Sequence, residues 1–144
     1  MYRAEDNSAQ GIGSRTSRLG YATSTDGIHF ERDTKPAFYP AKDNQVENEC
    51  PGGTEDPRIA MTEDGTYVLL YTQWNRKVPR LAVATSKDLK HWTKFGPAFE
   101  KAYNGKFKDE ATKSASLVTT LKGDKQVIAK VNGKYFMYWG EKNA

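Results

Sequence analysis

Leu81-Ala-Val-Ala-Thr-Ser-Lys-Asp-Leu-Lys-His-Trp92 repeats an earlier stretch of the chain, Leu19-Gly-Tyr-Ala-Thr-Ser-Thr-Asp-Gly-Ile-His-Phe30. Six of the twelve positions are identical, and Pro-Ala-Phe follows each copy, at residues 36–38 and 97–99. The second copy begins 62 residues after the first (19 to 81). A repeat with such a period is typical of propellers and repeat arrays.

The region around the second copy has the content of one propeller blade. Residues 67–74 are rich in β-branched and aromatic side chains and follow a Glu-Asp-Gly turn. Four short antiparallel strands are expected, at residues 58–61, 67–74, 80–85 and 91–93. No stretch with helical periodicity competes with them. The Ser-x-Asp turns of the two copies are interpreted as punctuation between strands.

The remaining sequence supplies two half-blades, so we expect an all-β chain with about two blades of a β-propeller. The first copy ends one blade, and residues 113–140 begin another, with strands at 116–121, 126–131 and 134–139. Two blades cannot close a ring, since four to eight are usual. Residues 1–144 are therefore interpreted as one partial domain of a longer protein, with apolar blade faces left open. No signal peptide is visible at the first residues, and the compartment is left open.

Composition excludes several classes of protein. The chain has 144 residues and a net charge of +4, but basic and acidic residues are interspersed. This argues against nucleic-acid binding. The apolar runs are far too short for a membrane span. Cys50 is the only cysteine, and His29 and His91 are isolated, so neither a metal site nor a cofactor is expected.

The segment Pro51-Gly-Gly-Thr-Glu-Asp-Pro-Arg58 carries the best candidate for chemistry. Its two glycines allow a close approach of backbones. If the segment is extended, Glu55 and Asp56 point to opposite sides, and only one faces a given cleft. A carboxylate on a rigid turn, with Arg58 two residues further on the same side, suits proton transfer to a polar substrate. A solvated surface turn is the alternative.

Four motifs in order carry a resemblance to a known family. They are Arg3 at the end of a strand, Ala-Thr-Ser-x-Asp-Gly-x-x-Phe, Gly-Gly-x-Glu-Asp-Pro-Arg and Ala-Thr-Ser-Lys-Asp-Leu-x-x-Trp. Together they resemble glycoside hydrolase family 130, the β-mannoside phosphorylases and related β-mannosidases. The resemblance covers essentially the whole chain. It implies a five-bladed β-propeller with its active site in the central cavity, and a β-mannoside oligosaccharide as substrate.

The resemblance also implies roles for individual residues. Asp56 aligns with the catalytic acid, which in this family protonates the glycosidic oxygen through a sugar hydroxyl. Arg3 aligns with a sugar-binding arginine. The other residues expected to contact or surround the substrate are Glu5, Asp6, Asn7, Glu55, Arg58, Trp74 and Lys113. For Arg58 an ion pair that only orders the turn is the alternative, and for Trp74 it is packing within a blade.

The last strand of the chain bears on whether phosphate or water accepts the sugar in the reaction. In the family's phosphorylases a strand of the type Asn-Gly-Lys-Tyr-x-Met ends in His-Arg, and this arginine contacts phosphate. Here residues 132–137 continue as Tyr138-Trp-Gly-Glu141, and Lys113 is the remaining basic phosphate contact. We therefore expect inverting hydrolysis of β-1,2-linked mannosides, as in the β-mannosidases of this family, with Glu141 as the base and Glu110 as an alternative base.

Two other functions remain open at this point. One is a phosphorylase that uses inorganic phosphate as co-substrate and releases mannose 1-phosphate. The other is a non-catalytic carbohydrate-binding propeller, because a fold does not fix a function. A homo-oligomer is compatible with either. A binding module would not need Asp56 to be held in a fixed position.

Overall fold

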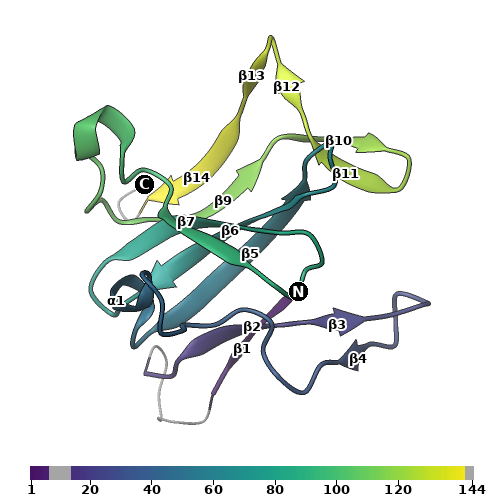
Figure 1. The fold of residues 1–144 in the computed structure, drawn as a ribbon, viewed down its shortest axis with the longest axis horizontal. Coiled ribbons are helices and arrows are strands. Elements are labelled where there is room, and N and C mark those ends of the chain that lie inside the picture. Colours follow the sequence, from purple (N-terminus) through teal and green to yellow (C-terminus); the bar gives the residue numbers. More distant parts are fainter. Residues whose placement is uncertain (7–13, 142–144) are drawn as a thin grey trace.

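The computed structural model describes residues 1–6 and 14–141, and these are built almost entirely of β-strands (Figure 1). Two short helical segments, α1 (Val46–Glu49) and η1 (Ala102–Gly105), interrupt the strands. The strands in the first half of the chain are β1 (Tyr2–Glu5), β2 (Ser17–Gly20), β3 (Ala22–Thr23), β4 (Glu31–Arg32), β5 (Gly53–Met61) and β6 (Tyr67–Trp74). Those in the second half are β7 (Pro79–Ser86), β8 (Thr93–Pro97), β9 (Thr112–Leu117), β10 (Thr119–Lys122), β11 (Lys125–Ile128), β12 (Lys130–Val131), β13 (Lys134–Tyr135) and β14 (Met137–Glu141). The expectation of an all-β chain is confirmed.

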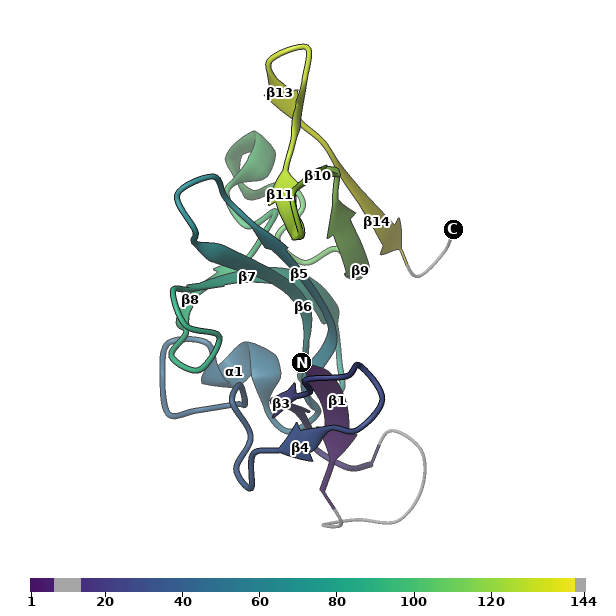
Figure 2. The same ribbon diagram turned by 90° about the vertical axis from the view of Figure 1, so that its right-hand side faces the viewer.

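The main sheet is built around the antiparallel meander β5–β6–β7–β8, which is the four-stranded unit expected from the sequence. Strand β6 lies at its centre and is buried along most of its length, as its β-branched and aromatic residues require. On the other side of β5 the sheet continues with β2 and then β1 (Figures 1 and 2). This arrangement brings the N-terminal strand next to the Gly-Gly-Thr-Glu-Asp-Pro-Arg segment.

Two glycines make the junction between β2 and β5 possible. Gly53 has φ 111° and pairs with Ser17, and a Cβ at Gly53 would lie 2.1 Å from the Ser17 carbonyl oxygen. A Cβ at Gly52 would lie 2.2 Å from the Trp74 ring. Only glycine fits at either position. The close backbone approach predicted for these two glycines is therefore confirmed.

The C-terminal strands leave the main sheet. Strands β9 and β14 pair with each other as a separate two-stranded sheet, and β12 and β13 form a projecting hairpin (Figure 1). The strand expected at 116–121 is divided between β9, which begins at Thr112 and ends at Leu117, and β10, which begins at Thr119. The fourth strand of the meander, β8, starts at Thr93 instead of His91, since residues 86–91 form a turn.

The two sequence repeats form the same turn. In each, a serine hydroxyl accepts backbone N–H groups, and an aspartate two residues later accepts two more and contacts a histidine Nδ1. The residues are Ser24, Asp26 and His29 in the first copy and Ser86, Asp88 and His91 in the second. The Asp–His contacts measure 2.6 and 2.7 Å. These hydrogen bonds hold the pKa of both aspartates well below its usual range. The interpretation of these motifs as punctuation agrees with this geometry.

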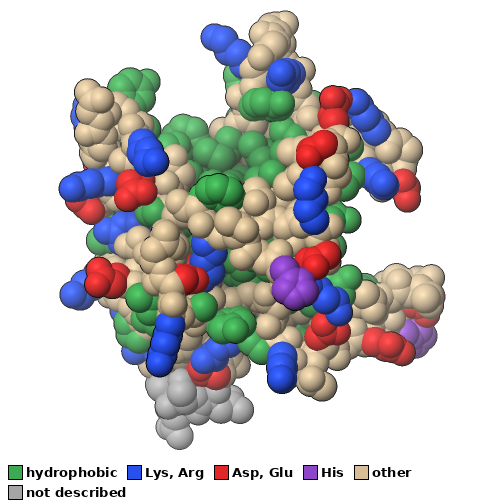
Figure 3. All heavy atoms as spheres, in the orientation of Figure 1, with side chains coloured by type: hydrophobic (Ala, Val, Ile, Leu, Met, Phe, Trp, Pro, Cys, Tyr) green, Lys and Arg blue, Asp and Glu red, His purple; other side chains and the backbone are tan. Residues whose placement is uncertain are grey.

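Two apolar clusters hold the sheets together. One contains Leu19, Phe38, Leu69 and Tyr71, between the repeat copies and β6. The other packs Leu70 and Leu81 against Ala115 of β9. Beside them, side chains from the C-terminal strands are exposed, among them Leu121, Tyr135, Tyr138 and Trp139. Hydrophobic side chains gather in the upper part of the face shown in Figure 3. Among the described residues the sheets stay open and no closed ring forms.

A buried carboxylate ties α1 to the main sheet. Glu49 is fully buried and accepts hydrogen bonds from the Tyr71 hydroxyl (2.9 Å) and from Gln73 Nε2 (3.3 Å). Its other oxygen pairs with Lys94 Nζ of β8 at 2.5 Å. Burial raises the pKa of Glu49, and the pairing with Lys94 opposes this shift. None of the described helices is long and apolar enough to cross a membrane.

We predict that Glu49→Ala in the full-length protein lowers the free energy of unfolding by about 3–5 kcal/mol, because it leaves Lys94 and the Tyr71 hydroxyl buried without this partner. Denaturant unfolding followed by tryptophan fluorescence measures the change. Glu47→Ala is the control, since Glu47 lies on the same short helix and is exposed. Equal stability of the two variants would show that the buried network is unimportant.

Candidate active site

A bulge in β5 shapes the site. Strand β5 pairs with β6 at Glu55↔Thr72 and again at Arg58↔Leu70, so that Asp56 and Pro57 lie opposite the single residue Tyr71. Asp56 has φ 49°, in the left-handed region that non-glycine residues rarely adopt. Bulges of this kind re-aim side chains next to active sites. The segment is thus part of a paired strand, whereas the sequence predicted a turn before the strand.

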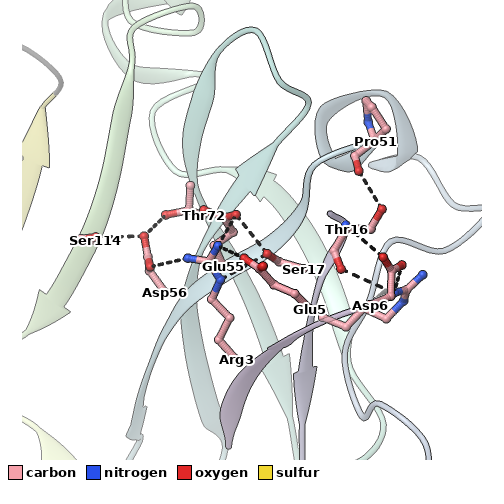
Figure 4. Close-up of polar contacts among 11 residues, drawn as sticks. Arg3, Glu5, Asp6, Thr16, Ser17, Pro51, Glu55, Asp56, Thr72 and Ser114 are labelled. Atoms are coloured by element: carbon pink, nitrogen blue, oxygen red, sulfur yellow. Dashed lines mark hydrogen bonds and ion pairs between the residues drawn. The ribbon is translucent and has the colours of Figure 1, made fainter. Parts of the chain in front are cut away.

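Three carboxylates surround the guanidinium of Arg3 (Figure 4). Arg3 Nη2 lies 2.9 Å from Glu55 Oε1 and 2.8 Å from Glu5 Oε1, and Nη1 lies 3.7 Å from Asp56 Oδ1. Glu55 and Asp56 therefore face the same side. The expectation that they point apart is wrong, because it assumes a regular strand and the bulge removes the alternation.

Three hydroxyl groups complete this cluster, and the sequence analysis missed all of them. Ser17 Oγ accepts a hydrogen bond from Arg3 Nε (3.2 Å) and donates to Glu55 Oε1 (3.1 Å). Asp56 Oδ2 accepts hydrogen bonds from Ser114 Oγ (3.1 Å) and Thr72 Oγ1 (3.4 Å). Both carboxylates are thus held by side chains from neighbouring strands. The only sequence signal that bears on Ser17 is the Gly52-Gly53 pair, which allows another strand to approach closely; that strand is β2, which pairs through Ser17.

The electrostatics of the cluster centre on Glu55. Burial raises its pKa, and the nearby Asp56 and Glu5 charges act in the same direction. Arg3 and the Ser17 hydroxyl oppose this shift. The side chain of Asp56 is 26% exposed, compared with 18% for Glu55. Asp56 is therefore held in place by its neighbours while it remains accessible to a substrate.

Glu55, Trp74 and Lys113 line one hollow together with Lys77, Thr72 and Pro79. Its volume is about 210 Å³. This is less than the roughly 300–1,000 Å³ of a typical ligand pocket. The hollow therefore has the volume of only part of such a pocket. Lys113 and Ser114 are neighbours on β9, so the same strand contributes to the hollow and to the contacts of Asp56.

Other predicted residues lie elsewhere. Asp6 pairs with Arg18 and accepts the Thr16 N–H at 3.3 Å, apart from the Arg3 cluster (Figure 4). Arg58 donates to the Pro57 carbonyl at 3.0 Å and lines a different hollow. It does not hold Asp56, because the bulge separates their side chains and Arg3 provides the guanidinium instead.

The remaining predicted residues are near the C-terminus or outside the described ranges. The backbone of Glu141 pairs with Thr112 at the end of β14, and its side chain is outside the described part, as is the whole of Asn7. Glu110 is exposed on the loop before β9. Within residues 1–6 and 14–141 no group of three or more potential metal ligands occurs.

Most glycoside hydrolases use a pair of carboxylates, and Glu55 and Asp56 lie together beside Arg3. The comparisons with known proteins agree: the family described as β-1,4-mannooligosaccharide phosphorylase matches residues 2–143. The chain belongs to this family, glycoside hydrolase family 130.

Three relatives illustrate the similarity. The 1,2-β-oligomannan phosphorylase of Thermoanaerobacter sp. (strain X514) is 38% identical over 141 residues, which is 95% of this chain and 40% of the relative. A crystal structure from Parabacteroides distasonis ATCC 8503, provisionally named as a glycoside hydrolase, is 99% identical with a TM-score of 0.94 and covers 97% of this chain and 40% of its own.

A third relative, with 65% identity and a TM-score of 0.93, covers 96% of this chain and 39% of its own. It comes from work reporting that the GH130 family of mannoside phosphorylases contains glycoside hydrolases that target β-1,2 mannosidic linkages in Candida mannan. The chain thus spans about 40% of the length of these relatives. The family description and the Thermoanaerobacter relative support the phosphorylase alternative better than the hydrolysis expected from the sequence.

The raised pKa of Glu55 predicts a pH dependence of stability. The folded state favours the neutral carboxyl group of Glu55. The contribution of this group to the free energy of unfolding is therefore complete below its ordinary pKa of 4.5, and it is lost as the pH rises through the raised pKa of the folded state. In the full-length enzyme, the Tm of the wild type relative to Glu55→Gln should therefore fall as the pH rises from about 4 to 7.

Glu63→Gln is a control with the opposite sign. Lys122 lowers the pKa of Glu63, so the wild type should gain Tm relative to Glu63→Gln over the same range. Thermal scans at a series of pH values measure both differences. Parallel curves for the two variants would contradict the assignment of a raised pKa to Glu55.

Proposed function

We propose that the longer protein to which this chain belongs cleaves β-1,2-linked mannosides, with Asp56 as the proton donor. The observation that carries the proposal is the geometry of Asp56: a bulge turns it toward Arg3 and two hydroxyl groups orient it. A group held in this way suits general acid catalysis, because its orientation requires no rearrangement before proton transfer. The relative from Thermoanaerobacter acts, by its name, on a 1,2-β-oligomannan.

The other residues of the cluster have supporting roles in this proposal. Arg3 binds sugar hydroxyls and holds Glu55 in place through their ion pair. Trp74 offers an aromatic face at the hollow beside Glu55. The remaining wall of the substrate site comes from parts of the longer protein that follow or precede these strands.

Phosphate is the acceptor that the family description and the Thermoanaerobacter relative favour. The structure adds a second cation to the one anticipated from the sequence, because Lys77 and Lys113 line the same hollow. Two ammonium groups bind an anion better than one, although neither offers the bidentate contact of an arginine. In this reaction phosphate attacks the anomeric carbon and mannose 1-phosphate is released.

Water is the second candidate, and two observations favour it. Gly140 and Glu141 stand where the family's phosphorylases carry His-Arg, and Gly140 pairs with Lys113 in the sheet. A carboxylate at this place repels phosphate and could activate water instead. The structure that is 65% identical comes from work on hydrolases of this family.

We further propose that these strands form part of a five-bladed β-propeller. The meander β5–β8 has the strand number and order of one blade. The exposed apolar side chains of β13 and β14 would then be covered by the next blade, as packing between blades requires.

The acceptor can be determined with the full-length enzyme and β-1,2-mannobiose. Phosphorolysis predicts mannose 1-phosphate that forms only when phosphate is added, and hydrolysis predicts mannose at a rate independent of phosphate. In either case Asp56→Asn should lower kcat by about 10²–10⁴-fold, the usual value of a positioned acid. Unchanged turnover by Asp56→Asn would remove this residue from the mechanism.

Lys113 and Glu141 provide a second test of the same question. If phosphate is the acceptor, Lys113→Met should raise the KM for phosphate about 10-fold with little effect on the KM for mannobiose, because it removes one charge-assisted contact. If water is the acceptor, Glu141→Gln should abolish hydrolysis while sugar binding persists. Lys77→Met is the companion variant, since Lys77 lines the same hollow from the loop between β6 and β7.

A further inference from the structure

A second bulge lies opposite the first. Strand β9 pairs with β14 at Ser116↔Tyr138 and at Lys113↔Gly140, so that Ser114 and Ala115 share the single partner position of Trp139. Ser114 has φ 52°, close to the 49° of Asp56. Both residues therefore adopt the left-handed conformation without being glycine. Such conformations cluster at functional sites.

The two bulge residues are in contact. Ser114 Oγ donates to Asp56 Oδ2 at 3.1 Å (Figure 4). Strand β5 belongs to the main sheet and β9 to the separate sheet with β14, so this hydrogen bond crosses from one sheet to the other. Each bulge turns its side chain out of the regular alternation and toward the other strand. The hydrogen bond depends on both bulges.

We infer that Ser114 is a positioning residue that fixes the orientation of the Asp56 carboxyl group, an inference that rests on the proposed role of Asp56 as proton donor. Thr72 donates to the same oxygen, Oδ2. Oδ2 is thus engaged by two hydroxyl groups, and Oδ1 lies 3.7 Å from Arg3 Nη1, so that contacts on both oxygens fix the plane of the carboxyl group. After transfer, the carboxylate keeps both hydrogen bonds, so the donor does not reorient during the reaction.

A role in the stability of the fold explains the serine at position 114 less well than a role in positioning Asp56. The residue is exposed, and glycine would adopt its backbone conformation without strain. What serine adds at this position is its hydroxyl group, and the partner of that hydroxyl is Asp56. Removal of the side chain should therefore affect proton donation and leave the fold intact.

The test uses Ser114→Gly in the full-length enzyme, because glycine relieves the backbone while it deletes the hydroxyl. With β-1,2-mannobiose, kcat should fall about 10-fold, a part of the 10²–10⁴-fold contributed by a positioned acid, and KM should stay within about twofold. With 2,4-dinitrophenyl β-mannoside, whose leaving group needs no proton, the rate should stay within about twofold of the wild type. Tm should be unchanged or higher.

The matched control is Ser116→Gly, the same substitution two residues along β9, where the serine has no hydrogen bond to Asp56. It should leave the ratio of the two rates unchanged. Wild-type kcat in Ser114→Gly, or an equal loss on both substrates, would overturn the inference. Asp56→Asn separates this failure from that of the proposed function. If Asp56→Asn is inactive on mannobiose, only the inference about Ser114 fails. If Asp56→Asn is active, the proposal that Asp56 is the proton donor is wrong.

Discussion

Strand β5 is paired with β6 on both sides of Asp56, and the extra residue between the two paired stretches determines where the aspartate points. The pairing cannot slip by one residue, because a slip would turn the buried face of β5 and β6 toward solvent. The unusual backbone of Asp56 is therefore maintained by many ordinary contacts. Without the bulge, Glu55 and Asp56 would lie on opposite faces and could not share Arg3.

Strand β6 connects this site with the buried carboxyl group of Glu49. Tyr71 and Gln73 contact Glu49 on one face of the strand, and Thr72 between them contacts Asp56 on the other. The alternation of a regular strand makes this division possible. The buried Glu49 network and the contact with Asp56 thus use neighbouring residues of one strand.

The sequence predicted the parts of the structure that depend on local pattern. The β-branched and aromatic run at 67–74 predicted a central strand, and Gly52 and Gly53 predicted a close approach of backbones. The bulge was not predictable, because nothing in a Glu-Asp-Pro-Arg segment requires φ above zero at the aspartate. Spacing favoured Arg58 as the partner of Asp56, whereas the actual partner, Arg3, is adjacent only through the pairing of β1, β2 and β5. Contacts between distant strands, such as that of Ser114 with Asp56, leave no mark in the local sequence.

The bulge in β9 also bears on the choice between phosphate and water. Adjacent residues of a regular strand point to opposite faces, and Lys113 and Ser114 could then not both reach the site. With Ser114 in the left-handed conformation, Ser114 contacts Asp56 while Lys113 lines the hollow beside Glu55. One short segment thus contributes both to the contacts of Asp56 and to the lining of the hollow. Gly140 of β14 pairs with Lys113 across this small sheet. In the proposed reaction the positive charge of Lys113 favours phosphate over water at this place, because opposite charges attract each other.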